Sequence, residues 1–197
     1  NPQHTYAPSA SVQTFNVTLI AYDDNGCPDT ISHTVTVNPQ PAAAYSADTA
    51  CVGDATDFTD LSSATAGAIN TWTWDFGDGM GTSALQNPQY TYASSGVPQI
   101  FNATLMIEDA NGCRDTVIHP VTVNPLPVVN FAANAACTGS NSVFIDNSFS
   151  NGGVLNSWTW DFGDGIGTSA LQDPVYTYAT VMVPTNYNVN LEVTDVN

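Results

Sequence analysis

One eight-residue stretch occurs twice in this chain, and it constrains the fold more than any other feature. Trp-Thr-Trp-Asp-Phe-Gly-Asp-Gly fills residues 72–79 and returns 86 positions later at residues 158–165. The same spacing separates Cys27 from Cys113 and Cys51 from Cys137. Between residues 70–92 and 156–178, 19 of 23 positions are identical. The chain is therefore a tandem array without insertions, in which each period must be one folding unit.

The period divides the chain into three parts. Residues 1–41 are the C-terminal part of one repeat, residues 42–127 are a complete repeat, and residues 128–197 are the N-terminal part of a third. Proline-rich segments, residues 38–41 and 124–127, close the first two parts and predict short, semi-rigid joints. We interpret the chain as a segment of a longer repetitive polypeptide whose 86-residue unit has only a small core.

The charge balance excludes several classes of partner. The chain has 18 acidic residues against one cation, Arg114, which gives a formal net charge of −17. Such a negative field disfavours nucleic acid and anionic membranes. The sequence is 43% hydrophobic, with aromatic residues at regular positions, unlike a disordered acidic tail. It contains no run of about twenty apolar residues that would predict a membrane-spanning helix.

Short runs of alternating apolar and polar residues, separated by turn signals, predict an all-β sandwich. In the complete repeat we expect strands over residues 42–47, 55–60, 72–76, 90–92, 101–107 and 117–123. Trp72, Trp74 and Phe76 share one face of the third strand, which predicts that all three lie in the core. Asn111-Gly112 predicts a hairpin turn, and the Ser/Ala/Thr/Gly-rich stretch at 60–70 predicts a surface loop.

Three motifs in this order resemble the PKD (polycystic-kidney-disease-type) domain. They are Trp74 to Gly79, Asn87 to Tyr92, and Asp109 to Cys113, and the resemblance covers the complete repeat and both partial ones. It implies a seven-stranded immunoglobulin-like sandwich that serves as an extracellular spacer or adhesion module. The cysteine-bearing version is similar to copies in large surface proteins of Bacteroidota-type bacteria. The residues of the fold signature are Trp72, Trp74, Asp75, Phe76, Gly77, Asp78 and Gly79, with Trp158, Trp160, Asp161, Phe162, Gly163, Asp164 and Gly165 one period later.

One cysteine of each kind per repeat predicts disulfides in an extracellular setting. The first hypothesis pairs Cys51 with Cys113 inside one repeat, worth about 2–4 kcal/mol, with the partners of Cys27 and Cys137 outside these residues. The alternative applies if the two cysteines lie at opposite ends of the sandwich. Each would then pair across a joint with a neighbouring repeat.

The carboxylates invite a metal or catalytic interpretation, which we weigh against a structural one. Asp75 and Asp78 stand three apart in a glycine-rich turn, where they could ligate a cation, but turn capping is the simpler role. Asp23 and Asp24 are a second calcium candidate, although the copy of this pair one period later keeps only one carboxylate. Otherwise we expect no cofactor. No Ser/His/Asp set recurs and a catalyst duplicated in every repeat would be unusual, so we do not expect an enzyme.

Three threonines follow aspartates in a pattern that resembles the Bacteroidota O-glycosylation signal. They are Thr30, Thr49 and Thr116. The prediction for the whole chain is a structural or adhesive segment of a cell-surface stalk or filament. Its partners would be the neighbouring repeats, other copies associating laterally, or surface glycans. The alternative is a set of carbohydrate- or calcium-binding accessory modules of a secreted hydrolase, with Trp72 as the aromatic residue to test for exposure.

Overall fold

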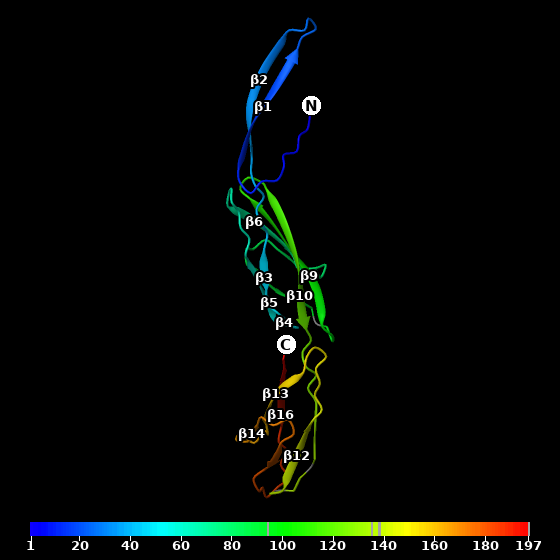
Figure 1. Cartoon of the computed structure of the whole chain (residues 1–197). Helices are drawn as coiled ribbons and strands as arrows, with labels where there is room; N and C mark the ends of the chain where they lie inside the picture. The colour runs from blue at the N-terminus through cyan, green and yellow to red at the C-terminus, as the bar shows by residue number, and fades with distance from the viewer. Residues whose placement is uncertain (94, 135, 138, 197) are drawn as a thin grey trace. The chain divides into compact units, whose positions relative to one another are not determined.

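Every regular element of the described chain is a β-strand. The computed structural model describes residues 1–93, 95–134, 136–137 and 139–196, and within these it contains sixteen strands and no helix (Figure 1). The described part accordingly has no helix capable of spanning a membrane. The chain forms two compact units, one of residues 1–48, 56–90 and 101–121 and one of residues 49–55, 91–100 and 122–197.

The partial repeat at the N-terminus is a long antiparallel hairpin. Strand β1 (Gln13–Tyr22) pairs with β2 (Pro28–Val37) along its whole length (Figure 1). Gly26 at the turn has φ +83°, a conformation that an L side chain rarely adopts, so the Asn-Gly pair fixes the turn here as at 111–112. Phe15, Val17 and Leu19 of β1 lie on one face of the hairpin with Ile31 of β2, Ile20 and Tyr22 lie on the other face, and all of these side chains are exposed to solvent.

The complete repeat contains two sheets, as the alternation of its sequence predicts. One sheet has the order β4 (Ala50–Cys51), β10 (Arg114–Asn124), β9 (Gln99–Asp109), β6 (Ile69–Asp75) and β7 (Thr82–Ser83). The other has the order β3 (Tyr45–Ala47), β5 (Ala55–Asp60) and β8 (Gln89–Thr91). The two-residue strands β4 and β7 are the elements that the sequence pattern does not predict. The surface loop expected before the tryptophan strand is present at residues 61–68.

An aromatic cluster joins the two sheets. The indole of Trp74 on β6 has no exposed surface and contacts the rings of Tyr45 on β3 and Phe58 on β5, with ring centres 5.0 and 5.4 Å away. Burying side chains of this size stabilises the fold by about 1.5–3 kcal/mol each. The Tyr45 hydroxyl also lies 2.7 Å from the carbonyl oxygen of Ala103 on β9, to which it donates, and it accepts the N–H of His119 on β10 at 3.2 Å. The sheets are thus held by packing and by hydrogen bonds.

The third repeat builds the same two layers from fewer strands. One sheet has the order β11 (Phe131–Ala133), β12 (Asn141–Asp146) and β15 (Val175–Thr177), and the other has β14 (Thr168–Ser169), β13 (Leu155–Asp161) and β16 (Asn190–Asp195). The core of this repeat contains Phe144, Trp160, Phe162, Leu191 and Val193. These are the counterparts of Phe58, Trp74, Phe76, Leu105 and Ile107, all of which are buried in the second repeat. The repeated sequence therefore gives a repeated core.

Candidate functional site

The signature aspartates lie in the turn that follows the core strand β6, where they accept hydrogen bonds from the chain itself. The Oδ1 atom of Asp75 accepts the N–H of Gly77 at 2.9 Å. The Oδ1 atom of Asp78 accepts the N–H groups of Met80 and Gly81, both at 2.9 Å, and its Oδ2 atom accepts a very short bond from the Tyr90 hydroxyl. Both carboxylate oxygens of Asp78 are therefore engaged within the turn.

The third repeat reproduces this turn. Asp164 accepts the N–H of Gly167 at 2.8 Å through Oδ1, and its Oδ2 atom accepts the Tyr176 hydroxyl at 2.6 Å. Asp161 caps the N–H of Gly163 at 2.9 Å. In both copies the corresponding N–H groups and tyrosine hydroxyl donate to the corresponding carboxylate oxygens. This indicates a structural turn that the fold requires in every repeat.

The hydrogen bonds shift the acidity of the partners in opposite directions. The bond to Asp78 raises the pKa of Tyr90 to about 12. Burial opposes the charged form of Asp78, but the bonds from Tyr90, Gly81 and Met80 outweigh it, so the pKa of the carboxyl lies below its usual value. In the third repeat the bond from Tyr176 similarly lowers the pKa of Asp164. A general acid at neutral pH needs a raised pKa, so this environment is unsuited to the acid half of a carboxylate pair.

Two glycines of the turn are required by close packing. A Cβ atom on Gly77, whose φ is +81°, would lie 2.4 Å from the carbonyl oxygen of Asn102 on β9. A Cβ atom on Gly81 would lie 2.3 Å from the ring of Tyr90, which stacks on Phe76 with ring centres 4.1 Å apart. The turn is thus pressed between a strand backbone and an aromatic stack, which leaves the Gly77 and Gly81 sites no room for a side chain.

The two tryptophans of the signature differ in burial, contrary to the expectation that both lie in the core. Trp74 is fully buried, whereas Trp72 is half-buried. The indole N–H of Trp72 donates to Oδ2 of Asp60 at 2.8 Å, an atom that also accepts the side-chain amide of Gln86 at 3.1 Å. Trp72 lies two residues nearer the start of β6, at the rim of the sandwich. There its indole N–H can donate a hydrogen bond to a carboxylate. Both rings lie on one side of the strand, but only Trp74 lies deep.

Asp60 is the site residue that the sequence reasoning missed. Its counterpart Asp146 accepts the indole N–H of Trp158 at 2.8 Å, so the pair is conserved between the two repeats of the chain. Bonds of this kind, together with the N–H of Ser62, keep the pKa of Asp60 below its usual value although burial of the carboxyl opposes this. The available signal was an aspartate recurring at the period, twelve residues before each half-buried tryptophan.

The calcium candidate in the first hairpin also has a capping role. The Oδ1 atom of Asp23 accepts the N–H groups of Asn25 and Cys27, both at 2.9 Å. The bond from Cys27 lowers the pKa of the Asp23 carboxyl, and the counterpart Asp109 makes the same two bonds one period later. Nowhere among the described residues do three or more His, Cys, Asp or Glu side chains gather in a group that could hold a metal. Asp24 has no counterpart carboxylate in the second repeat.

The expected bridge between Cys51 and Cys113 is not formed, which corrects the first disulfide hypothesis. All four cysteines are free thiols. Cys51 on β4 lies opposite Asn124 at the end of β10, whereas Cys113 immediately precedes the start of that strand. Strand β10 has 11 residues and spans roughly 36 Å at about 3.3 Å per residue. A disulfide needs Cα atoms within about 7 Å, so the two thiols are too far apart. Pairing across a joint stays a prediction.

The three candidate threonines are accessible. Thr49 lies just before β4, and Thr30 and Thr116 lie near the starts of β2 and β10, at the same position of the repeat. All three side chains are exposed. Exposure is a requirement for glycosylation and does not establish it, so the modification stays a prediction.

Comparisons with known proteins agree with the sandwich and its repetition. The sequence profile described as the PKD domain matches residues 36–123 and 124–197. Among solved structures, the PKD1 domain of Vibrio anguillarum Epp is similar with 23% identity and a TM-score of 0.39, covering 44% of this chain and 96% of that one. The PKD1 domain from the Vibrio cholerae metalloprotease PrtV has 27% identity and a TM-score of 0.38, covering 43% and 96%. Two consecutive profile matches span most of the sequence, and the chain therefore belongs to the PKD domain family.

Proposed function

We propose that this chain is a spacer segment of an extracellular protein, a length of stalk or filament that carries other parts away from a bacterial surface. PKD domains occur in secreted or extracellular proteins, which supports the location. The observation that carries the proposal is the internal use of the signature. Both oxygens of Asp78 accept hydrogen bonds from the same repeat, and the copy at Asp164 does likewise. Each copy of the motif forms hydrogen bonds only within its own repeat, so repeating it at a fixed period lengthens the molecule.

The electrostatics of the repeat agree with a role that involves no catalysis. The carboxyl groups of Asp78 and Asp164 have pKa values below the usual range rather than the raised value of a catalytic acid. Their donors are backbone N–H groups and a tyrosine of the same repeat, which leaves them poorly placed to take a substrate proton. An enzyme is therefore not part of the proposal.

The test is how the length of the molecule scales with the number of repeats. Concatemers of residues 42–127 in one, two and four copies would be measured by small-angle X-ray scattering. A spacer of stiff sandwiches predicts a maximum dimension that rises linearly, by roughly 3–4 nm per copy, about the length of an eleven-residue strand. Glycine-serine chains of equal residue number are the control, since their size grows with the square root of length. Growth of the concatemers along the control curve would overturn the proposal.

The competing role is that of a carbohydrate- or calcium-binding accessory module, for which half-buried Trp72 is the residue to probe. Its indole N–H is already bonded to Asp60, so a sugar would have to contact the part of the ring that stays exposed. A glycan array and a calcium titration on the same concatemers decide between the roles. Glycan binding that is lost in Trp72→Ala, or a calcium-dependent rise in the thermal midpoint, would favour the accessory module.

A further inference from the structure

The two kinds of cysteine lie at opposite ends of a repeat. Cys51 on β4 is opposite Asn124, the last residue of β10. Cys113 lies just before β10, and the carboxylate of Asp115, two residues further on, accepts the N–H of Ala43 at the start of the repeat at 2.8 Å. Cys51 therefore lies at the end where the chain leaves the repeat, and Cys113 lies at the end where the chain enters it.

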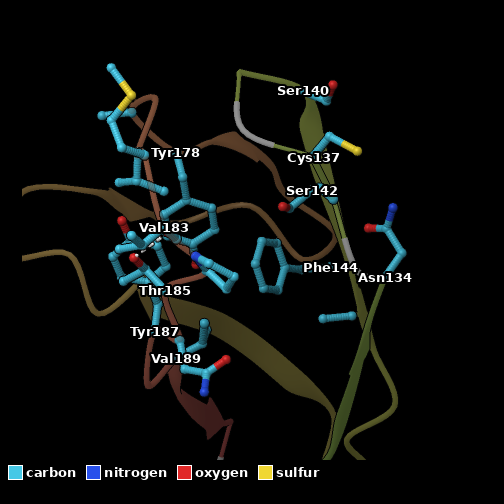
Figure 2. Close-up of a pocket in the computed structure, with 17 residues that line it drawn as sticks. Asn134, Cys137, Ser140, Ser142, Phe144, Tyr178, Val183, Thr185, Tyr187 and Val189 are labelled. Carbon is cyan, nitrogen blue, oxygen red and sulfur yellow. Dashed lines mark hydrogen bonds between the residues drawn. The ribbon is translucent and has the colours of Figure 1, made fainter.

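Neither kind of thiol is locked inside the core of its own repeat. Cys51 and Cys113 are partly exposed free thiols. Cys137, the counterpart of Cys51 in the third repeat, lies in the loop before β12, and Figure 2 shows its sulfur directed away from Phe144 in the core. Both kinds can therefore meet a partner that belongs to another repeat.

One contact recurs at both places where the chain passes from one repeat to the next. The side-chain amide of Asn151, in the loop before β13, donates to the carbonyl of Gly96 in the second repeat at 2.8 Å. One period earlier, the hydroxyl of Thr65 makes a longer bond of 3.5 Å to the carbonyl of Ala10. Gly96 precedes β9, which starts at the end of the sheet where β10 finishes. The loop of each repeat thus lies against the far end of the preceding repeat.

The residue next to Asn151 connects this contact to the end of β16. The hydroxyl of Ser150 donates to Oδ2 of Asp195 at 2.6 Å. Asp195 is the counterpart of Asp109, whose Oδ1 atom accepts the N–H of Cys113 at 3.0 Å. The position of this aspartate therefore marks where a cysteine of the second kind lies in a repeat.

Asp195 lies near the cysteine of the preceding repeat. Burial is the main cause that raises the pKa of the Cys51 thiol, and the negative charges of Asp195 and Asp54 raise it further. Charges act on one another mainly within about 8 Å at physiological salt. Cys51, Gly96 and the whole of the third repeat also belong to one compact unit. Cys51 is thus close to the aspartate that, one repeat earlier, caps the Asn-Gly-Cys turn.

We propose that Cys51 forms a disulfide with the cysteine of the following repeat that is the counterpart of Cys113. Distance excludes the other pairings, because a disulfide needs Cα atoms within about 7 Å. Within one repeat the two thiols are separated by roughly 36 Å along β10, and cysteines of one kind in successive repeats are separated by a whole repeat. The bridge closes the joint covalently. It deepens the proposed spacer role, on which it rests for an oxidising extracellular setting.

The bond forms by exchange with the disulfide of a small thiol such as oxidised glutathione. One cysteine thiolate attacks that disulfide, which gives a mixed disulfide and releases one small thiolate. The second cysteine thiolate attacks the protein sulfur of the mixed disulfide and releases the other. The two cysteines lose two protons and two electrons, and the oxidant takes up both to become two thiols. Because the pKa of Cys51 is raised, this thiol is a weak nucleophile at neutral pH, and bridging should be faster at higher pH.

Two-copy concatemers of residues 42–127 test the pairing, since the complete repeat contains both sheets and its own aromatic core. One variant keeps Cys51 in the first copy and Cys113 in the second, with serine at the other two positions. The matched control keeps Cys113 in the first copy and Cys51 in the second, which places the thiols at the two far ends. With oxidised glutathione, the first variant is expected to form an intramolecular bridge between Cys51 and Cys113, detected by peptide mapping of the monomer. The control is expected to form it at least about tenfold more slowly.

The intact 197-residue chain provides a second measurement. Asp195→Asn removes a negative charge beside Cys51 and is expected to speed alkylation of that thiol by iodoacetamide at least about twofold near pH 8. Asp109→Asn is the control, because its carboxylate is not among the charges that raise the pKa of Cys51. No bridge in the first concatemer, equal bridging in both, or an unchanged alkylation rate in Asp195→Asn would each overturn the proposal. Concatemers that lengthen linearly in scattering without forming the bridge would overturn this proposal and leave the spacer role standing.

Discussion

Replacing Gly77 or Gly79 by alanine separates two reasons for glycine in the signature turn. Both residues have a positive φ, +81° at Gly77 and +76° at Gly79. A Cβ atom on Gly79 would meet nothing within 4 Å. The same atom on Gly77 would lie 2.4 Å from the carbonyl oxygen and 2.7 Å from the carbonyl carbon of Asn102. The pair therefore shares a backbone conformation and differs in the space around it.

The magnitudes follow from these contacts. A left-handed conformation is unfavourable for an L residue by about 1 kcal/mol, so Gly79→Ala should lower the free energy of unfolding of the second repeat by about that amount. Gly77→Ala must also displace the backbone of β9, which is held between β6 and β10, and this overpacking adds roughly 1–3 kcal/mol. The expected total for Gly77→Ala is about 2–4 kcal/mol.

The assay must report each repeat separately. The four tryptophans are divided evenly, Trp72 and Trp74 in the second repeat and Trp158 and Trp160 in the third. Fluorotryptophan labelling with ¹⁹F NMR follows each of them through a urea titration, whose midpoint gives the change in stability. The third repeat is the internal reference and should keep its midpoint. Equal losses for Gly77→Ala and Gly79→Ala would refute the steric argument.

Three further predictions follow from the contacts of the second repeat and its strands. Tyr45→Phe removes the hydroxyl that donates to Ala103 while keeping the ring, and should lower the free energy of unfolding by about 1 kcal/mol in the same urea titration. Asp78→Asn should return the pKa of Tyr90 from about 12 toward its ordinary 10 in a tyrosinate absorbance titration. The stabilisation that this raised pKa gives the folded state is complete below pH 10 and is lost as the pH rises through 12. The parent should therefore lose stability over that window, and the variant should lose less. Peptide mapping of the oxidised chain should give no peptide linking Cys51 to Cys113, because the two residues lie at opposite ends of β10.

The layers and the core could be predicted because they depend on side-chain alternation. The run from Phe101 to Ile107 alternates apolar and polar residues, and the structure buries Ala103, Leu105 and Ile107 completely. The Asn-Gly turns and the loop before β6 were likewise encoded locally, in residue types that determine backbone conformation. The short strands β4 and β7 have two residues each, too few for any alternation to be seen.

What the sequence could not supply were the distances between elements. Parity places Trp72 and Trp74 on one face of β6 but does not show that Trp72 lies at the rim, beside Asp60. Counting cysteines predicts pairs, yet only the position of β4 at the far end of β10 shows that Cys51 cannot reach Cys113. In both cases the position of the residue along its strand decides the outcome, because the two ends of a repeat lie a full strand length apart.

The small strand β4 has a consequence for a molecule under load. It runs parallel to β10, with Ala50 opposite Val123 and Cys51 opposite Asn124, and the N–H of Val52 donates to the carbonyl of Asn124 at 2.8 Å. The chain enters the repeat ahead of β4 and leaves it after β10. Pulling on the two ends therefore slides the parallel segments past each other in shear, so that their hydrogen bonds resist together instead of opening one at a time. The two residue pairs between β4 and β10, together with the pairing of β3 to β5 ahead of them, would then act as the clamp that holds the repeat under load.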